Sequence, residues 1–220
     1  MNTVPIDLTV EIRSADGTST EFYQTDEESI RKSLRLLATP RLLTQPQLVL
    51  ASEHSVTTIP CRAIDMLLVR TSAQVPLTFP AGLLDIVEMP EDQSVEDSAS
   101  PDDYQTDNSE SSGPRTVHVE IHTLGGWVST FRALLIDRGT VQDQRQSLAH
   151  LFDLPLVPFR LRAGGIGLIN PANMTGINVC PTPGALPETA LPMQLLRWTP
   201  FQFKTPANIT SQFSHDNEIR

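Results

Sequence analysis

The sequence is poor in aromatic residues and cysteine, and it lacks any long apolar run. Aromatic side chains make up 5% of the 220 residues, so a core has to be built mainly from Leu, Ile and Val. The two cysteines, Cys61 and Cys180, show no CxxC spacing, which predicts buried free thiols in a reducing compartment. No apolar run approaches the roughly 20 residues of a bilayer-spanning helix, and no signal-peptide pattern opens the chain. We therefore expect a cytoplasmic protein without a membrane span.

Positive charge is missing from the middle of the chain. The formal net charge is −10, and residues 88–114 hold nine carboxylates without a single Lys or Arg. The rest of the chain is close to neutral, which argues against nucleic-acid binding, because phosphate contacts need a net basic surface. Residues 88–115 also combine scattered Pro and Ser with few apolar side chains, and this composition predicts a disordered acidic linker.

A weak internal repeat, with a spacing of about 110 residues, divides the chain into two halves. Val10-Glu11-Ile12 in the first half corresponds to Val119-Glu120-Ile121 in the second, and a tight-turn dipeptide follows each of them. The same order of features appears once in each half: a hairpin, a capped helix, a second hairpin, a bend with proline, and a proline turn. This order predicts that one module has been duplicated.

Each half is predicted to have the order β-β-α-β-β-β, with one helix on a mostly antiparallel sheet, which is an α+β fold. The predicted units are domains at 5–87 and 116–204, the linker at 88–115, and a C-terminal tail at 205–220. A domain of this size buries only about 60% of its unfolded surface, so each is marginal alone. We therefore expect the halves to dock on each other, or the chain to self-associate.

Both predicted helices begin at sequences typical of a capping box. Thr25-x-x-Glu28 precedes the helix expected at Asp26–Ala38, and Thr140-x-x-Asp143 precedes the one expected at Val141–Phe152. Three apolar residues of the first helix share one face and are expected to pack on the sheet: Ile30, Leu34 and Leu37.

His118, Glu120 and His122 form the most suggestive cluster of metal-ligand types. In an extended strand they share one face, while the apolar residues between them share the other. The two histidines would be about 13 Å apart in a strand, so one ion cannot bind all three side chains. A metal site would need two neighbours and ligands from other elements. An ordinary polar strand face is the simpler interpretation, and we expect no cofactor.

Arg160 and Arg162 alternate with apolar residues in an expected strand, which gives that strand one basic side. Together with Arg132 and Arg197, this side can meet an anion, a protein partner or the acidic linker itself. The simpler interpretation is a solvated strand face. If the linker covers the basic side, removal of the linker should tighten the binding of a polyanion.

Two further patterns are not expected to carry chemistry. The Gly-rich segment 163–167 lacks the following helix that a phosphate-binding loop needs, and it is predicted to be a hairpin turn. Ser147, His150 and Asp153 have the residue types of a catalytic triad, but such spacings on a helix do not converge.

The sequence favours a non-enzymatic interaction, scaffold or regulatory protein that acts through protein–protein contacts or self-assembly into a homo-oligomer. Two modules on a flexible tether raise the effective concentration of the second binding event to about millimolar. Two alternatives stay open. One is a small-ligand or metal-binding protein, with or without enzymatic activity, that uses His118, Glu120 and His122. The other is a nucleic-acid-binding regulator whose basic side is masked by the acidic linker.

Overall fold

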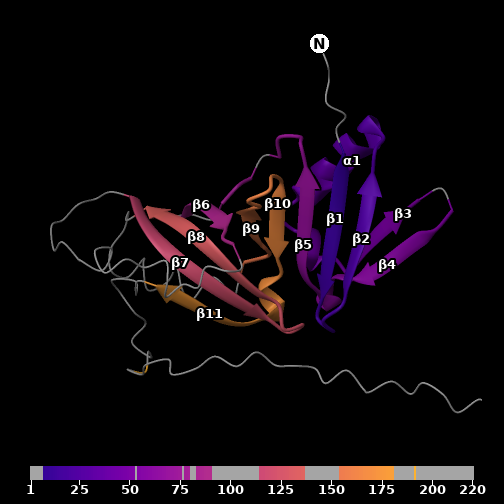
Figure 1. Cartoon of the computed structure of the whole chain (residues 1–220). Coiled ribbons are helices and arrows are strands. Elements are labelled where there is room, and N and C mark those ends of the chain that lie inside the picture. Colours follow the sequence, from indigo (N-terminus) through magenta and orange to yellow (C-terminus); the bar gives the residue numbers. More distant parts are fainter. Residues whose placement is uncertain are drawn as a thin grey trace, which may run out of the picture.

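The computed structural model describes residues 7–52, 54–75, 77–79, 83–90, 114–136, 154–180 and residue 191. Its strands are Leu8–Ser14 (β1), Ser19–Gln24 (β2), Gln47–Ala51 (β3), Val56–Pro60 (β4), Ile64–Thr71 (β5), Leu83–Glu88 (β6), Pro114–Thr123 (β7), Val128–Ile136 (β8), Val157–Arg160 (β9), Ile166–Ile169 (β10) and Met174–Cys180 (β11). Nine of them form one sheet in the order β11-β7-β8-β6-β9-β10-β5-β1-β2, and β3 and β4 form a separate pair (Figure 1). The predicted α+β class is confirmed for the described residues, with one α-helix and a mostly antiparallel sheet.

Several predicted segments lie outside the described residues. They are the acidic segment 91–113, the second helix at 141–152 with Ser147, His150 and Asp153, and the tail at 205–220.

The helix α1 (Glu27–Leu37) begins one residue later than predicted. Its N-cap is Asp26, whose carboxylate accepts a hydrogen bond from the backbone N–H of Ser29 at 2.8 Å. The capping box predicted at Thr25 is therefore wrong by one position, since the aspartate carboxylate, a strongly preferred cap, binds the free amide of the first turn. The predicted apolar face is confirmed by the packing of three residues on the core: Ile30, Leu34 and Leu37.

The strand β6 was not predicted, because the sequence there follows a proline turn and runs into the acidic segment. It pairs antiparallel with β8 and meets β9 in parallel at Val87 and Arg160. A strand from the first half of the chain therefore lies inside the part of the sheet that the second half forms.

The two halves pair their strands in the same register. Val10 of β1 faces Val69 of β5, and Val119 of β7 faces Val179 of β11. In both pairs the register shifts by one residue near the end, so that Asp65 and Thr175 are the extra residues of two matching β-bulges.

The first hairpins of the two halves also match in their turns. Gly17 N donates to Ser14 O at 3.0 Å, and Gly126 N donates to Thr123 O at the same distance. The two glycines have φ angles of 81° and 77°, a region that favours glycine. Positions that correspond in sequence therefore have the same backbone conformation in both halves.

The two halves are joined into one sheet by β5 and β10. These strands pair antiparallel, with Leu168 opposite Leu67 and Ile166 opposite Val69. Beyond the last pair, Asn170 N donates to Asp65 O at 2.9 Å. The second half thus adds a strand to the edge of the first half, so the halves do not form separate sheets.

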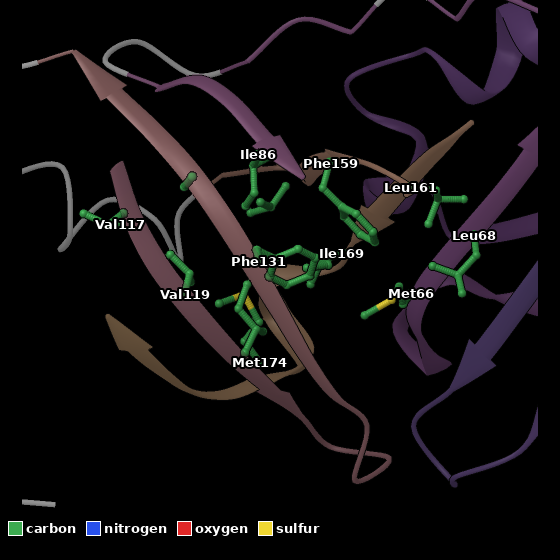
Figure 2. Close-up of a cluster of buried hydrophobic side chains, with 13 residues drawn as sticks. Met66, Leu68, Ile86, Val117, Val119, Phe131, Phe159, Leu161, Ile169 and Met174 are labelled. Atoms are coloured by element: carbon green, nitrogen blue, oxygen red, sulfur yellow. The ribbon is translucent and has the colours of Figure 1, made fainter. Parts of the chain in front are cut away.

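The core is divided into two clusters that lie on opposite sides of β5. Met66 and Leu68 belong to the cluster around Phe131 and Phe159, which Figure 2 shows between the strands of the second half. Leu67 and Val69 belong to the other cluster, which packs under α1. Because successive side chains of a strand point to opposite faces, β5 is buried on both sides.

Phe131 and Phe159 are fully buried and meet edge to face, with ring centroids 4.7 Å apart. Among the described residues, no helix has the length and apolar character that crossing a membrane requires.

Candidate functional site

The strand β7 presents the predicted cluster of His118, Glu120 and His122. The apolar residues that alternate with them, Val117, Val119 and Ile121, are buried in the core, as expected from the alternation. His122 is also buried, so this face is not fully solvated.

The structure does not bring the three side chains of this cluster to one point. His122 Nε2 lies 2.5 Å from Glu120 Oε1, whereas His118 Nδ1 lies 3.3 Å from Met89 Sδ. Within the described ranges, no three His, Cys, Asp or Glu side chains gather in an arrangement that suits a metal ion. The face offers two separate polar contacts, that of His118 with Met89 and that of His122 with Glu120.

Arg160 and Arg162 do not lie on the same strand. The expected strand 159–163 ends at Arg160 in the structure, and Arg162 is exposed in the turn that follows. Arg160 Nε donates to Asp85 Oδ1 at 2.9 Å, a partly exposed ion pair between β9 and β6. Arg162 lines a shallow hollow of about 420 Å³ with Glu88 and Met89.

The Gly-rich segment forms the turn between β9 and β10. Gly164 and Gly165 have φ angles of 96° and 99°, and a strand follows instead of a helix. A Cβ atom on Gly165 would lie 2.0 Å from Val69 O, so the turn needs glycine where it passes close to β5. Its role is to fit the β9–β10 hairpin against the first half of the chain.

Neither Cys61 nor Cys180 forms a disulfide. Burial raises the pKa of the Cys61 thiol, which makes it a weak nucleophile at neutral pH.

The densest set of buried polar contacts lies where the two halves meet, at the short 3₁₀ helices Cys61–Ala63 (η2) and Pro171–Asn173 (η5). Asn170 Nδ2 donates to Ile64 O at 2.9 Å and to Cys61 O at 3.3 Å. Asn173 Nδ2 donates to the same Ile64 O at 2.9 Å and to Arg62 O at 3.0 Å. The two asparagines therefore hydrogen-bond three backbone carbonyls of the other half, those of Cys61, Arg62 and Ile64.

Asp65 makes a second contact across this junction. Its Oδ2 accepts a hydrogen bond from Gly125 N at 2.7 Å, in the hairpin turn of the second half. A Cβ atom on Gly125 would lie 2.3 Å from Ser14 O, so no other residue fits there without movement. Asp65 is fully buried, and this burial raises the pKa of its carboxyl group.

Trp127 adds a third contact between the halves. Its Nε1 donates to Ser14 O at 3.1 Å, and the guanidinium of Arg13 lies 4.9 Å from the centre of its ring. Sequence reasoning missed these junction residues, because each contact joins strands far apart in the chain. The Asn-Pro sequence at Asn170 predicted only a bend.

Glu11 was also missed, since the sequence indicated it only as part of the repeat Val10-Glu11-Ile12. It is buried and accepts hydrogen bonds from Arg13 at 2.8 Å and Arg70 at 2.7 Å. Burial alone would raise the pKa of Glu11, but the hydrogen bonds and positive charges of the two arginines outweigh it and lower the pKa.

The sequence matches no protein-family model, and neither a curated protein nor a solved structure is similar enough to count as a match. The candidate site therefore has to be derived from the geometry of the chain itself.

The remaining feature with a functional implication is the hairpin of β3 and β4. Within the described part of the chain, it pairs with nothing beyond itself. Val49 and Val56 are 51% and 68% exposed on it, whereas all of β10 in the corresponding hairpin is buried. Leu48, Leu50 and Ile59 pack on the core, so the other face of the hairpin presents exposed apolar side chains beside strand edges that are unpaired among the described residues.

Proposed function

We propose that the chain is a non-enzymatic interaction protein, built from one small module copied twice, that works through protein–protein contacts at the edges of its sheet. The observation that carries the proposal is the junction of β10 and β5. It is an intramolecular contact in which one half adds a strand to the sheet of the other, as partners do in strand addition between proteins. The matching registers, bulges and turns of the halves support the duplication.

The duplication explains why the junction indicates a function. If both modules descend from one ancestor, each inherits the strands that make this contact. The β9–β10 hairpin makes this contact inside the chain. The β3–β4 hairpin has strand edges that are unpaired among the described residues. Exposed apolar edges of this kind are avoided by proteins without a partner, because they promote aggregation.

The proposal is tested with the tagged full-length chain, purified from its own cells and analysed by quantitative mass spectrometry. We expect specific proteins, or untagged copies of the chain, to be enriched. The combination Val49→Lys and Val56→Lys should reduce this enrichment about tenfold, because it places two charges on the exposed apolar face of the hairpin. The matched control is Leu36→Lys, since Leu36 is 58% exposed on α1, away from the hairpin.

Two results would count against the proposal. One is that the hairpin variant retains every protein that the wild type retains. The other is stoichiometric zinc in the purified chain that is lost when His118→Ala and His122→Ala are combined. That second result would favour the metal-binding alternative, for which the contact of His122 with Glu120 is the best supporting observation.

A further inference from the structure

The junction of β10 and β5 has a counterpart that is left unused within the described residues. β10 and β4 are each the second strand of a hairpin and lead into a 3₁₀ helix, η5 or η2. β5 and β11 each follow that helix and pair in the same register with the first strand of their half. The counterpart of the β10–β5 contact is therefore a contact between β4 and β11.

This counterpart contact is not made within the described part of the chain. There, β4 pairs with β3 alone and β11 pairs with β7 alone. β11 is the last strand at one end of the nine-stranded sheet. Figure 1 shows β4 and β11 at opposite ends of the molecule, so a single copy in this conformation cannot join them.

We infer that β4 of one copy of the chain pairs antiparallel with β11 of a second copy, in the way that β10 pairs with β5 inside each copy. The inference rests on the proposed function, because it identifies a second copy of the chain as the partner in the proposed protein–protein contacts. The two contacting surfaces are different, so the contact is head to tail and produces a ring or an open chain of copies.

The backbone groups needed for this pairing point outward. Cys61 N donates to Pro46 O at 3.2 Å, so odd-numbered residues of β4 bond to β3, while Val56 and Thr58 face the open edge. By correspondence with Leu67 and Val69, the open edge of β11 presents Ile177 and Val179. The register observed between β10 and β5 then places Thr58 opposite Ile177, and Val56 opposite Val179.

The composition of the edges favours this pair over the other free end of the sheet. Neither β4 (VTTIP) nor β11 (MTGINVC) contains a charged residue. The strand β2, which ends the sheet on the other side, carries Glu21. Charged side chains are the usual means by which proteins block edge pairing, and β4 and β11 lack them.

The second-copy contact should be weaker than the internal one. Thr58 stands where β10 has Leu168, and Asn178 stands where β5 has Leu68. Pro60 has no N–H to match the hydrogen bond from Asn170 N to Asp65 O. Less apolar area is buried and one hydrogen bond is lost, so we expect assembly that is reversible and depends on concentration.

Sedimentation velocity over a range of concentrations tests the inference on the full-length chain. We expect the average mass of the wild type to rise with concentration, and Thr58→Pro to weaken the association about tenfold or more, because proline removes an outward N–H. Tyr23→Pro is the matched control: Ser14 N donates to Thr18 O, so even-numbered residues of β2 bond to β1 and Tyr23 faces the other open edge. It should associate like the wild type.

A monomeric wild type at every concentration overturns the inference, and so does a loss of association in Tyr23→Pro equal to that in Thr58→Pro. If the wild type stays monomeric but the tagged chain still enriches other proteins, the inferred pairing between copies is wrong and the proposed function stands.

Cysteine cross-linking gives a second readout that does not depend on proline. The internal register makes Thr57 and Asn178 a directly opposed pair, so we use Thr57→Cys and Asn178→Cys in two separate chains that both carry Cys180→Ser. Mixed under oxidising conditions, the two chains should form a disulfide-linked dimer that neither forms alone. Absence of this dimer contradicts the inference. So does a disulfide within one monomer when both cysteines are on the same chain, because β4 and β11 would then close in a single copy.

Discussion

Asn170→Ala is expected to lower the free energy of unfolding by about 2–4 kcal/mol, because the three hydrogen bonds of its buried side chain are lost, while Asn173 Nδ2 still donates to Ile64 O. Asn170 Nδ2 donates to Ile64 O and Cys61 O, and the side chain is only 5% exposed, so water does not readily replace it. The Oδ1 atom also accepts a hydrogen bond from Ala172 N at 3.2 Å, which holds the start of η5. Urea denaturation followed by circular dichroism measures the change.

Ala172→Asn is the control for this variant, because Ala172 is exposed two residues further along the same bend. A new surface amide there should change stability by no more than about 0.5 kcal/mol. If Asn170→Ala also changes stability by less than about 0.5 kcal/mol, the asparagine does not join the halves as described.

Asp65→Asn is expected to stabilise the protein at neutral pH, and this gain should disappear in acid. Burial raises the pKa of Asp65, so the neutral carboxyl group is the form that the folded state prefers. The contribution of Asp65 to stability is therefore fully present below its unfolded pKa of about 3.9, and it is lost as the pH rises through the higher folded pKa. Asparagine stays neutral throughout and keeps an oxygen that can accept from Gly125 N.

Thermal unfolding of the wild type and Asp65→Asn between about pH 3 and pH 7 gives the difference in stability at each pH, in which the titration of other carboxylates largely cancels. Asp65→Ala is the companion variant. It removes the acceptor of Gly125 N, and at acidic pH it should cost about 1–2 kcal/mol. A difference between wild type and Asp65→Asn that does not change with pH would show that the carboxyl group has an ordinary pKa.

The local features of the fold were predictable from sequence because they depend on neighbouring residues. Apolar spacing identified the buried face of α1, and turn dipeptides located the first hairpins at Gly17 and Gly126. The N-cap residue of α1 was not predictable, because Thr25 and Asp26 are both favourable N-cap residues and only the backbone geometry decides between them. The end of β9 at Arg160 was also missed, because the alternation of apolar and basic residues continues to Ala163 and only the geometry shows where the strand stops.

The pairing of distant strands was not predictable. The structure buries both faces of β5, but nothing in the sequence of this strand says that β10 is its neighbour. The same is true of the candidate site. The hydrogen bonds of Asn170 and Asp65 join positions far apart in the chain, and their residue types are also typical of ordinary turns.

Amide hydrogen exchange, measured by NMR on the chain at a concentration where it is monomeric, tests the central claim most directly. The claim is that β10 is bonded to β5 while its counterpart β4 has an open edge. We expect the amides of Ile166 and Leu168 to exchange slower than those of Val56 and Thr58 by about two orders of magnitude or more. Equal exchange rates at the two pairs of positions would mean that the halves are not joined through these strands.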